Sequence, residues 1–98
     1  HSKWNSFYAE LLLQEIYQLL DIKAFAAIAK RRTEFERVMD NEKIEKLVSP
    51  RMIGMVYARL ALYDYNKSKS LAAKTLQRGL QYAPNSSELK RYKKMLRL

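Results

Sequence analysis

The stretch "SLAAKTLQRGLQYAPNSSELKRYKKMLRL", residues 70–98, decides the fold prediction for this chain. Ala72, Leu76 and Gly79 stand four and three residues apart, and Pro84 follows five residues after Gly79. Side chains three and four residues apart share one face of a helix, and a proline does not continue a helix. The stretch therefore predicts a helix that stops at the proline and offers small side chains where a neighbouring helix can approach closely.

The residues after that proline predict one more helix. The sequence "NSSE" at residues 85–88 resembles a capping box, in which Asn85 and Glu88 satisfy each other's free backbone N–H groups. Leu89, Tyr92 and Leu96 then recur at helical spacing. We expect these three side chains to form the apolar face of the last helix.

The remainder of the chain repeats this pattern. A helix of about residues 6–20 follows Asn5 as N-cap, and Pro50 fits the first position of a helix that ends near Tyr65. Residues 41–48 predict two further turns. Between them we expect a helix capped by Asp21 and ending near Asp40, whose inward side chains are Ile22, Phe25, Ala29, Phe35, Val38 and Met39.

Composition agrees with an all-α fold. Hydrophobic residues make up 48% of the chain, which suits a folded domain, while 2 Gly and 2 Pro leave few turn signals for a sheet. We expect five or six helices in a single domain of residues 1–98, in which residues 1–3 are a tag remnant or linker. Short turns predict that consecutive helices pack as antiparallel pairs.

Residues 50–98 resemble a tetratricopeptide repeat. Ala72, Leu76, Gly79 and Pro84 match its second helix, and Tyr63 matches the aromatic residue of its first helix. "TLQRGLQYAP" and "ELKRY" are similar to the related half-a-tetratricopeptide (HAT) repeats of RNA-processing factors, and "EFERVM" at residues 34–39 looks like an upstream copy. The resemblance implies antiparallel helix pairs stacked as a short right-handed helical repeat.

The match has departures that leave a second architecture open. Arg59 and Leu60 stand where the repeat has a large apolar and then a small residue, while Arg31 and Lys43 replace the upstream alanine and proline. Any antiparallel helix pair presents a similar spacing. An unrelated small helical bundle is the alternative.

The residue types needed for catalysis are scarce. The chain has no Cys, a single His at position 1, no glycine-rich phosphate loop and no acidic cluster with ligand spacing. Carboxylates such as Glu34, Glu36 and Glu45 alternate with Lys or Arg, as on a solvated helix surface. We therefore expect no enzyme activity, catalytic residue, cofactor, metal or small-molecule substrate. No apolar run reaches the roughly 20 residues of a membrane span, and we expect no membrane association.

Positive charge is concentrated in the last third. Residues 66–98 hold 9 Lys and Arg against 1 Glu, whereas residues 1–65 hold 10 against 9 Asp and Glu. The predicted basic patch comprises Lys74, Arg78, Lys90, Arg91, Lys93, Lys94 and Arg97. It suits nucleic acid, an acidic peptide or an acidic subunit, and a merely solubilising surface is the alternative.

The first helix has an unusually wide apolar arc. The predicted partner-binding residues are Trp4, Phe7, Tyr8, Leu11 and Tyr17. Such an arc indicates contact with a partner protein or further repeats of the same chain, or else the central helix of a bundle. We expect a non-enzymatic scaffold that docks a protein helix or peptide. The HAT resemblance implies an intracellular assembly, nuclear or cytoplasmic, in RNA processing or ribosome biogenesis. A basic nucleic-acid-binding domain is the alternative function.

Overall fold

The computed structural model describes residues 6–41 and 43–98 of the chain, and these residues form six α-helices and no strand. The all-α prediction is therefore confirmed. The helices divide into two compact units, unit 1 (His1–Ser49) and unit 2 (Pro50–Leu98). The boundary lies between Ser49 and Pro50, where Pro50 predicted the start of a new helix. The expectation of a single domain stays a prediction.

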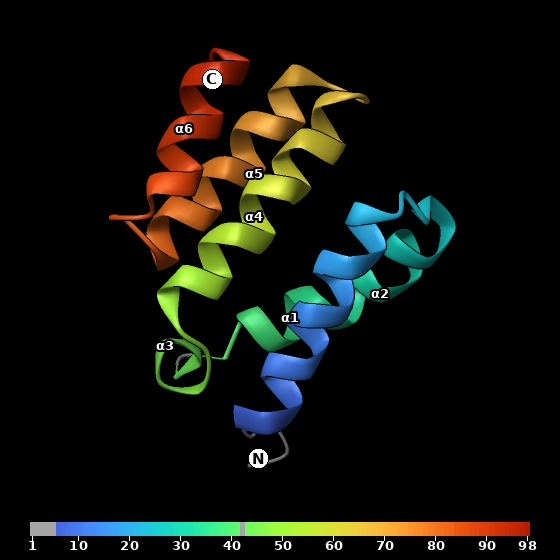
Figure 1. Cartoon of the computed structure of the whole chain (residues 1–98), viewed down its shortest axis with the longest axis vertical. Coiled ribbons are helices and arrows are strands. Elements are labelled where there is room, and N and C mark those ends of the chain that lie inside the picture. The colour runs from blue at the N-terminus through green and yellow to red at the C-terminus, as the bar shows by residue number, and fades with distance from the viewer. Residues whose placement is uncertain (1–5, 42) are drawn as a thin grey trace. The chain divides into compact units, whose positions relative to one another are not determined.

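Unit 1 contains α1 (Ser6–Asp21), α2 (Phe25–Met39) and the single turn α3 (Ile44–Leu47), and both α2 and α3 pack on α1 (Figure 1). The buried side chains follow the helical spacing of the sequence. They are Ala9, Leu12, Leu13 and Ile16 of α1, Ile28, Phe35, Val38 and Met39 of α2, and Ile44 of α3. The polar middle of α2 does not interrupt the helix.

The connection from α1 to α2 differs from the prediction. Asp21 is the last residue of α1, and the N-cap of α2 is Ala24, which has no side-chain capping bond. The amides of Lys23 and Ala24 donate to the carbonyls of Leu20 and Leu19, and Lys23 has a φ of 59°. This left-handed residue after a helix is a Schellman motif, which usually uses glycine. Ile22, Phe25 and Ala29 are exposed, and their predicted inward position is wrong. Ile22 lies in the connection between the two helices, and the buried side of α2 is the one that carries Ile28 and Phe35.

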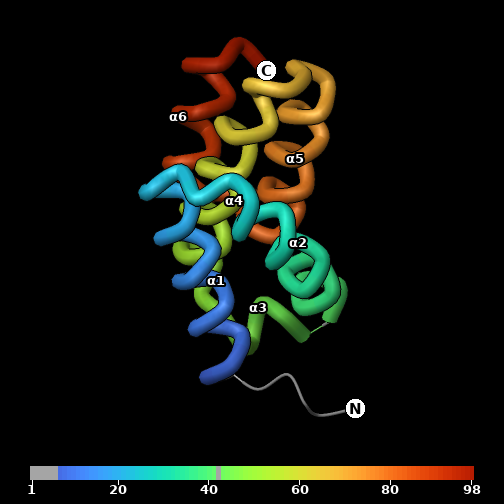
Figure 2. Tube along the Cα trace, turned by 90° about the vertical axis from the view of Figure 1, so that its right-hand side faces the viewer, coloured from blue at the N-terminus to red at the C-terminus, as the bar shows by residue number. Residues whose placement is uncertain are grey.

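Unit 2 contains α4 (Pro50–Tyr65), α5 (Lys69–Tyr82) and α6 (Ser87–Leu96). Helix α5 runs antiparallel beside α4 in both views, and α6 packs on both of them (Figures 1 and 2). Pro50 opens α4, and α5 ends two residues before Pro84, as the prolines predicted.

Two glycines set how closely these helices pack. A Cβ atom added at Gly79 of α5 would lie 2.6 Å from Cβ of Tyr57 on α4 and 3.2 Å from Cδ1 of Leu89 on α6. A Cβ atom at Gly54 of α4 would meet Ser86, with its Cβ at 2.9 Å. Ala72 is buried as well. The predicted close approach at small side chains is therefore confirmed.

Serine side chains start α5 and α6. The Ser68 hydroxyl accepts a hydrogen bond from the Leu71 amide at 3.2 Å, and the Ser86 hydroxyl accepts one from the Leu89 amide at 3.1 Å. The predicted capping box is wrong, since Ser86 and not Asn85 is the N-cap and the residue three positions later is Leu89, not Glu88. Glu88 pairs instead with Arg91, at 3.0 Å.

Candidate interaction surfaces

The outward side of α1 carries two exposed apolar side chains. Phe7 is 73% exposed and Leu11 is 48% exposed, one helical turn further along. Both lie opposite the buried residues Ala9, Leu12 and Ile16. Transferring such side chains into an apolar contact is favourable by roughly 25 cal/mol per Å². These two residues, which we call the α1 apolar face, are therefore available to a partner.

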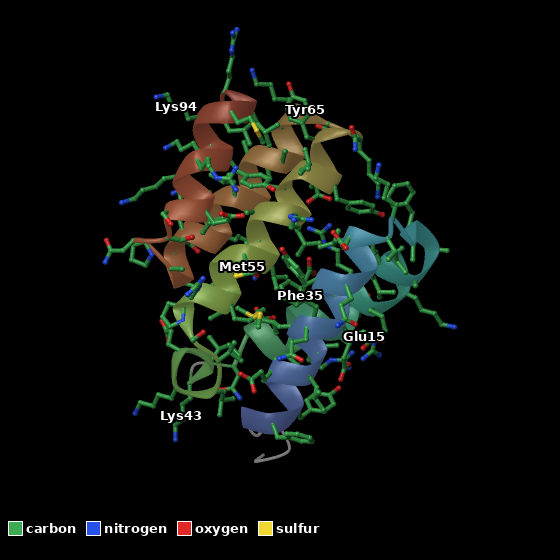
Figure 3. All side chains as sticks on the ribbon, viewed as in Figure 1. Glu15, Phe35, Lys43, Met55, Tyr65 and Lys94 are labelled. Carbon is green, nitrogen blue, oxygen red and sulfur yellow. The ribbon has the colours of Figure 1, made fainter. Side chains whose placement is uncertain are left out.

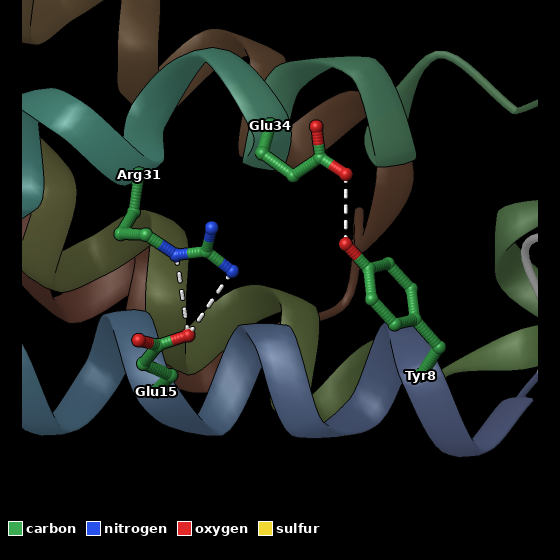
Figure 4. Close-up of polar contacts among 4 residues, drawn as sticks. All are labelled: Tyr8, Glu15, Arg31 and Glu34. Carbon is green, nitrogen blue, oxygen red and sulfur yellow. Dashed lines mark hydrogen bonds and ion pairs between the residues drawn. The ribbon is translucent and has the colours of Figure 1, made fainter.

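The other predicted apolar residues lie differently. Trp4 falls outside the described residues. The Tyr8 hydroxyl donates to Oε2 of Glu34 on α2 at 2.7 Å (Figure 4), and this hydrogen bond raises the pKa of Tyr8 above its usual value. Tyr17 is half-buried. Tyr8 thus connects α1 to α2, and among the predicted residues that the structure describes only Phe7 and Leu11 are exposed.

Ion pairs cover the surface of α1 and α2. Arg31 lies 3.2 Å from Glu15 across the two helices (Figure 4), and Arg37 lies 2.7 Å from Glu34 within α2. Exposed pairs of this kind each contribute about 0–1 kcal/mol. They agree with the predicted solvated, ion-paired surface.

Unit 2 accounts for the whole net charge of the chain. Unit 1 has 8 Lys and Arg against 8 Asp and Glu, whereas unit 2 has 11 against 2 and so a net charge of +9. Both carboxylates of unit 2 are engaged, because buried Asp64 accepts a hydrogen bond from Thr75 and Glu88 pairs with Arg91. Unit 2 therefore carries nine more cations than carboxylates.

The predicted basic patch comes from α6 and α5, and each of its residues is exposed. Five of them, which we call the α6 cations, lie in or just after α6: Lys90, Arg91, Lys93, Lys94 and Arg97. The hydrogen bond to Glu88 raises the pKa of the Arg91 guanidinium above its usual value. Lys74 and Arg78 lie on the exposed side of α5.

The turn between α4 and α5 adds further cations at one end of unit 2. Lys67 and Lys69 are exposed, and the ammonium of Lys67 lies 4.6 Å from the centre of the Tyr63 ring. Lys94 and Tyr65 mark this same end in Figure 3. Cation and ring attract each other by roughly 0.5–1 kcal/mol at exposed sites. Tyr63 is half-buried, while Tyr57 is the aromatic side chain that lies against Gly79 of α5.

A hollow of about 620 Å³ lies at the other end of unit 2. It lies between the first turns of α4 and the connection from α5 to α6, and its walls include Arg51, Met55, Tyr82, Pro84 and Ser86. The Tyr82 ring stacks on Tyr57, with centroids 5.9 Å apart. This hollow could not be predicted from the sequence, because its walls meet only when the three helices pack.

Sequence reasoning also missed the buried pair of Asp64 and Thr75. The Thr75 hydroxyl donates to Oδ2 of Asp64, and both residues are buried between α4 and α5. A signal was present, because Asp64 lies four residues after Leu60 and seven after Tyr57, on the inward side of α4. A carboxylate at that position predicts a buried hydrogen-bond partner.

The described residues contain neither a helix that could span a membrane nor a candidate metal site. No helix there combines the length and apolar composition needed to cross a membrane, and no group of three His, Cys, Asp or Glu residues in those segments is placed to hold a metal ion. Comparison with models of protein families, with curated proteins and with solved structures found no match for this chain.

Proposed function

We propose that this chain is a non-enzymatic scaffold that docks a partner protein through the α1 apolar face. The observation that carries the proposal is the exposure of Phe7 and Leu11 on the side of α1 opposite its buried residues. Aromatic and large aliphatic side chains dominate binding energy at protein interfaces. In water the same side chains are an aggregation risk, and their position together on one side of α1 favours a role in binding.

The arrangement of unit 2 supports a repeat-like scaffold. In this proposal α4 and α5 are the two helices of one tetratricopeptide-like unit, and α6 is the first helix of the next. Close packing at Gly79 and Gly54 supports this assignment, because small residues at helix contacts are what the repeat pattern uses. Stacked helix pairs give rigid, extended surfaces that suit docking more than catalysis.

The chemistry around Phe7 and Leu11 indicates the kind of partner. Glu10, Gln14 and Gln18 are exposed on the same side of α1. The surface is thus an apolar pair with a polar and acidic border, which matches an amphipathic helix whose apolar residues are flanked by Lys or Arg. By the HAT resemblance, we place this partner in an assembly that processes RNA.

Site-specific photo-crosslinking in cells tests the proposal. A photo-reactive amino acid at position 7 is expected to crosslink one defined protein, and the same group at position 30, on the exposed surface of α2, is the matched control. Leu11→Gln should remove most of the crosslink at position 7. Crosslinking that is equal at both positions, or that ignores Leu11→Gln, would contradict docking at this face.

A further inference from the structure

The positive charge of unit 2 calls for an explanation beyond solubility. A net charge of +9 on the 49 residues of Pro50–Leu98 repels itself and so opposes compact folding. Unit 1, of equal length, is neutral. A solubilising surface does not require that one unit carry all of the net charge, whereas a binding site for an anionic ligand in unit 2 would account for it.

Helix α6 concentrates this charge on its solvent side. Lys90 and Lys94 lie one turn apart, opposite the buried side chains of Leu89 and Tyr92. The helix ends in a Schellman motif, in which the Leu98 amide donates to the Lys93 carbonyl at 2.9 Å and Arg97 has a φ of 58°. The end of α6 is therefore defined, and its last cations project from ordered backbone.

The number of these cations fits the phosphates of a duplex. Lys90 to Arg97 extend over about 10 Å along α6. Duplex DNA presents a phosphate about every 1.7 Å of its axis when both strands are counted, which gives about six over that length. Arg91 is paired with Glu88, and no carboxylate among the described residues pairs with the other four α6 cations, which are Lys90, Lys93, Lys94 and Arg97.

The surface fits phosphate better than an acidic protein. The structure describes every residue of α6, and Met95 is the one large apolar side chain of this helix that is exposed. Protein interfaces usually need a cluster of buried aromatic or aliphatic anchors, whereas binding to a phosphate backbone needs mainly Lys and Arg. We propose that the α6 cations bind the phosphodiester backbone of nucleic acid, through charge and without reading base sequence.

The size of the salt effect follows from the number of cations. Four phosphate contacts predict a slope of about −3.6 for the logarithm of the binding constant against the logarithm of salt concentration. Affinity should therefore fall about 150-fold between 50 and 200 mM salt. With two contacts removed the slope should halve, and the fall should be only about 12-fold.

The test is a fluorescence anisotropy titration of the 98-residue chain with a labelled duplex DNA of arbitrary sequence, at both salt concentrations. We expect a dissociation constant below about 10⁻⁴ M at 50 mM salt. Lys90→Gln with Lys94→Gln should weaken binding and halve the salt slope. Lys30→Gln with Lys46→Gln, at exposed positions in unit 1, makes the same change in net charge and should preserve the slope. Helix content by circular dichroism verifies that each variant folds.

Three results would overturn the proposal. The first is a dissociation constant above about 10⁻⁴ M at 50 mM salt, which would make the surface solubilising only. The second is an equal loss in the two double variants, which would assign the effect to net charge and not to α6. The third is equally tight binding of poly-glutamate with the same number of charges, which would favour an acidic protein as the ligand. None of these results bears on the α1 apolar face.

Discussion

Replacing Gly79 with alanine would add one methyl group where α5 packs on α4. The new Cβ atom would lie 2.6 Å from Cβ and 3.0 Å from Cγ of Tyr57, and 3.2 Å from Cδ1 of Leu89. Leu89 can adjust by rotating its side chain. Cβ of Tyr57 cannot rotate away because it is bonded to the α4 backbone, so α4 and α5 must move apart.

Two opposing effects determine how Gly79→Ala changes the free energy of unfolding. In an unconstrained helix interior, alanine is more favourable than glycine by about 0.8–1.0 kcal/mol. Overpacking of a close contact costs about 1–3 kcal/mol. We expect a cost at the upper end of this range, because Cβ of Tyr57 cannot move without the α4 backbone. We therefore expect a net destabilisation of about 2 kcal/mol, or a melting temperature lower by about 10 °C.

Urea denaturation followed by circular dichroism measures this difference. The matched control is Gln81→Ala on the exposed side of α5, which should change the free energy by no more than about 0.5 kcal/mol. If Gly79→Ala instead stabilises the protein by about 1 kcal/mol, helix propensity alone governs the site. That result would refute the close packing of α4 and α5.

Two further variants test unit 1. Tyr8→Phe removes the hydrogen bond to Glu34 and should cost about 1 kcal/mol at pH 7. Because the pKa of Tyr8 in the folded protein is raised above 10.0, the full cost should be present below pH 10 and should vanish as the pH rises through the raised pKa. Urea titrations at several pH values measure this cost. A cost that does not depend on pH would contradict the hydrogen bond between Tyr8 and Glu34. Lys23→Gly should raise the free energy of unfolding by about 0.5 kcal/mol. Glycine removes the cost of about 1–2 kcal/mol that a left-handed backbone imposes on lysine, but it also increases the conformational entropy of the unfolded chain, which offsets part of this gain. Lys23→Ala should give no gain in urea titrations at pH 7, and a loss for Lys23→Gly would contradict the Schellman motif.

Local spacing was sufficient to predict most helices. Pro50 and Pro84 mark helix boundaries by covalent geometry, which does not depend on tertiary contacts. Small residues at 72 and 79 also predicted where helices approach. The connection after α1 could not be predicted, because a Schellman motif with Lys23 at the left-handed position lacks the usual glycine signal.

The surfaces were predictable to a smaller extent. An apolar residue on a helix is recognised from sequence, but its exposure depends on which side meets another helix. Phe7 and Tyr8 are neighbours, yet Phe7 is exposed and Tyr8 bonds to Glu34, 26 residues away. Exposure of charged residues is easier to predict, since burying an unpaired charge is costly.

Docking at α1 requires that Phe7 and Leu11 serve a contact outside the fold of the chain itself. The most direct measurement is the free energy of unfolding of the double variant Phe7→Gln with Leu11→Gln. Because these side chains are 73% and 48% exposed, we predict a loss of less than about 1.5 kcal/mol. A loss above about 3 kcal/mol, typical of a buried Phe or Leu, would show that both side chains belong to the core and would contradict the proposed function.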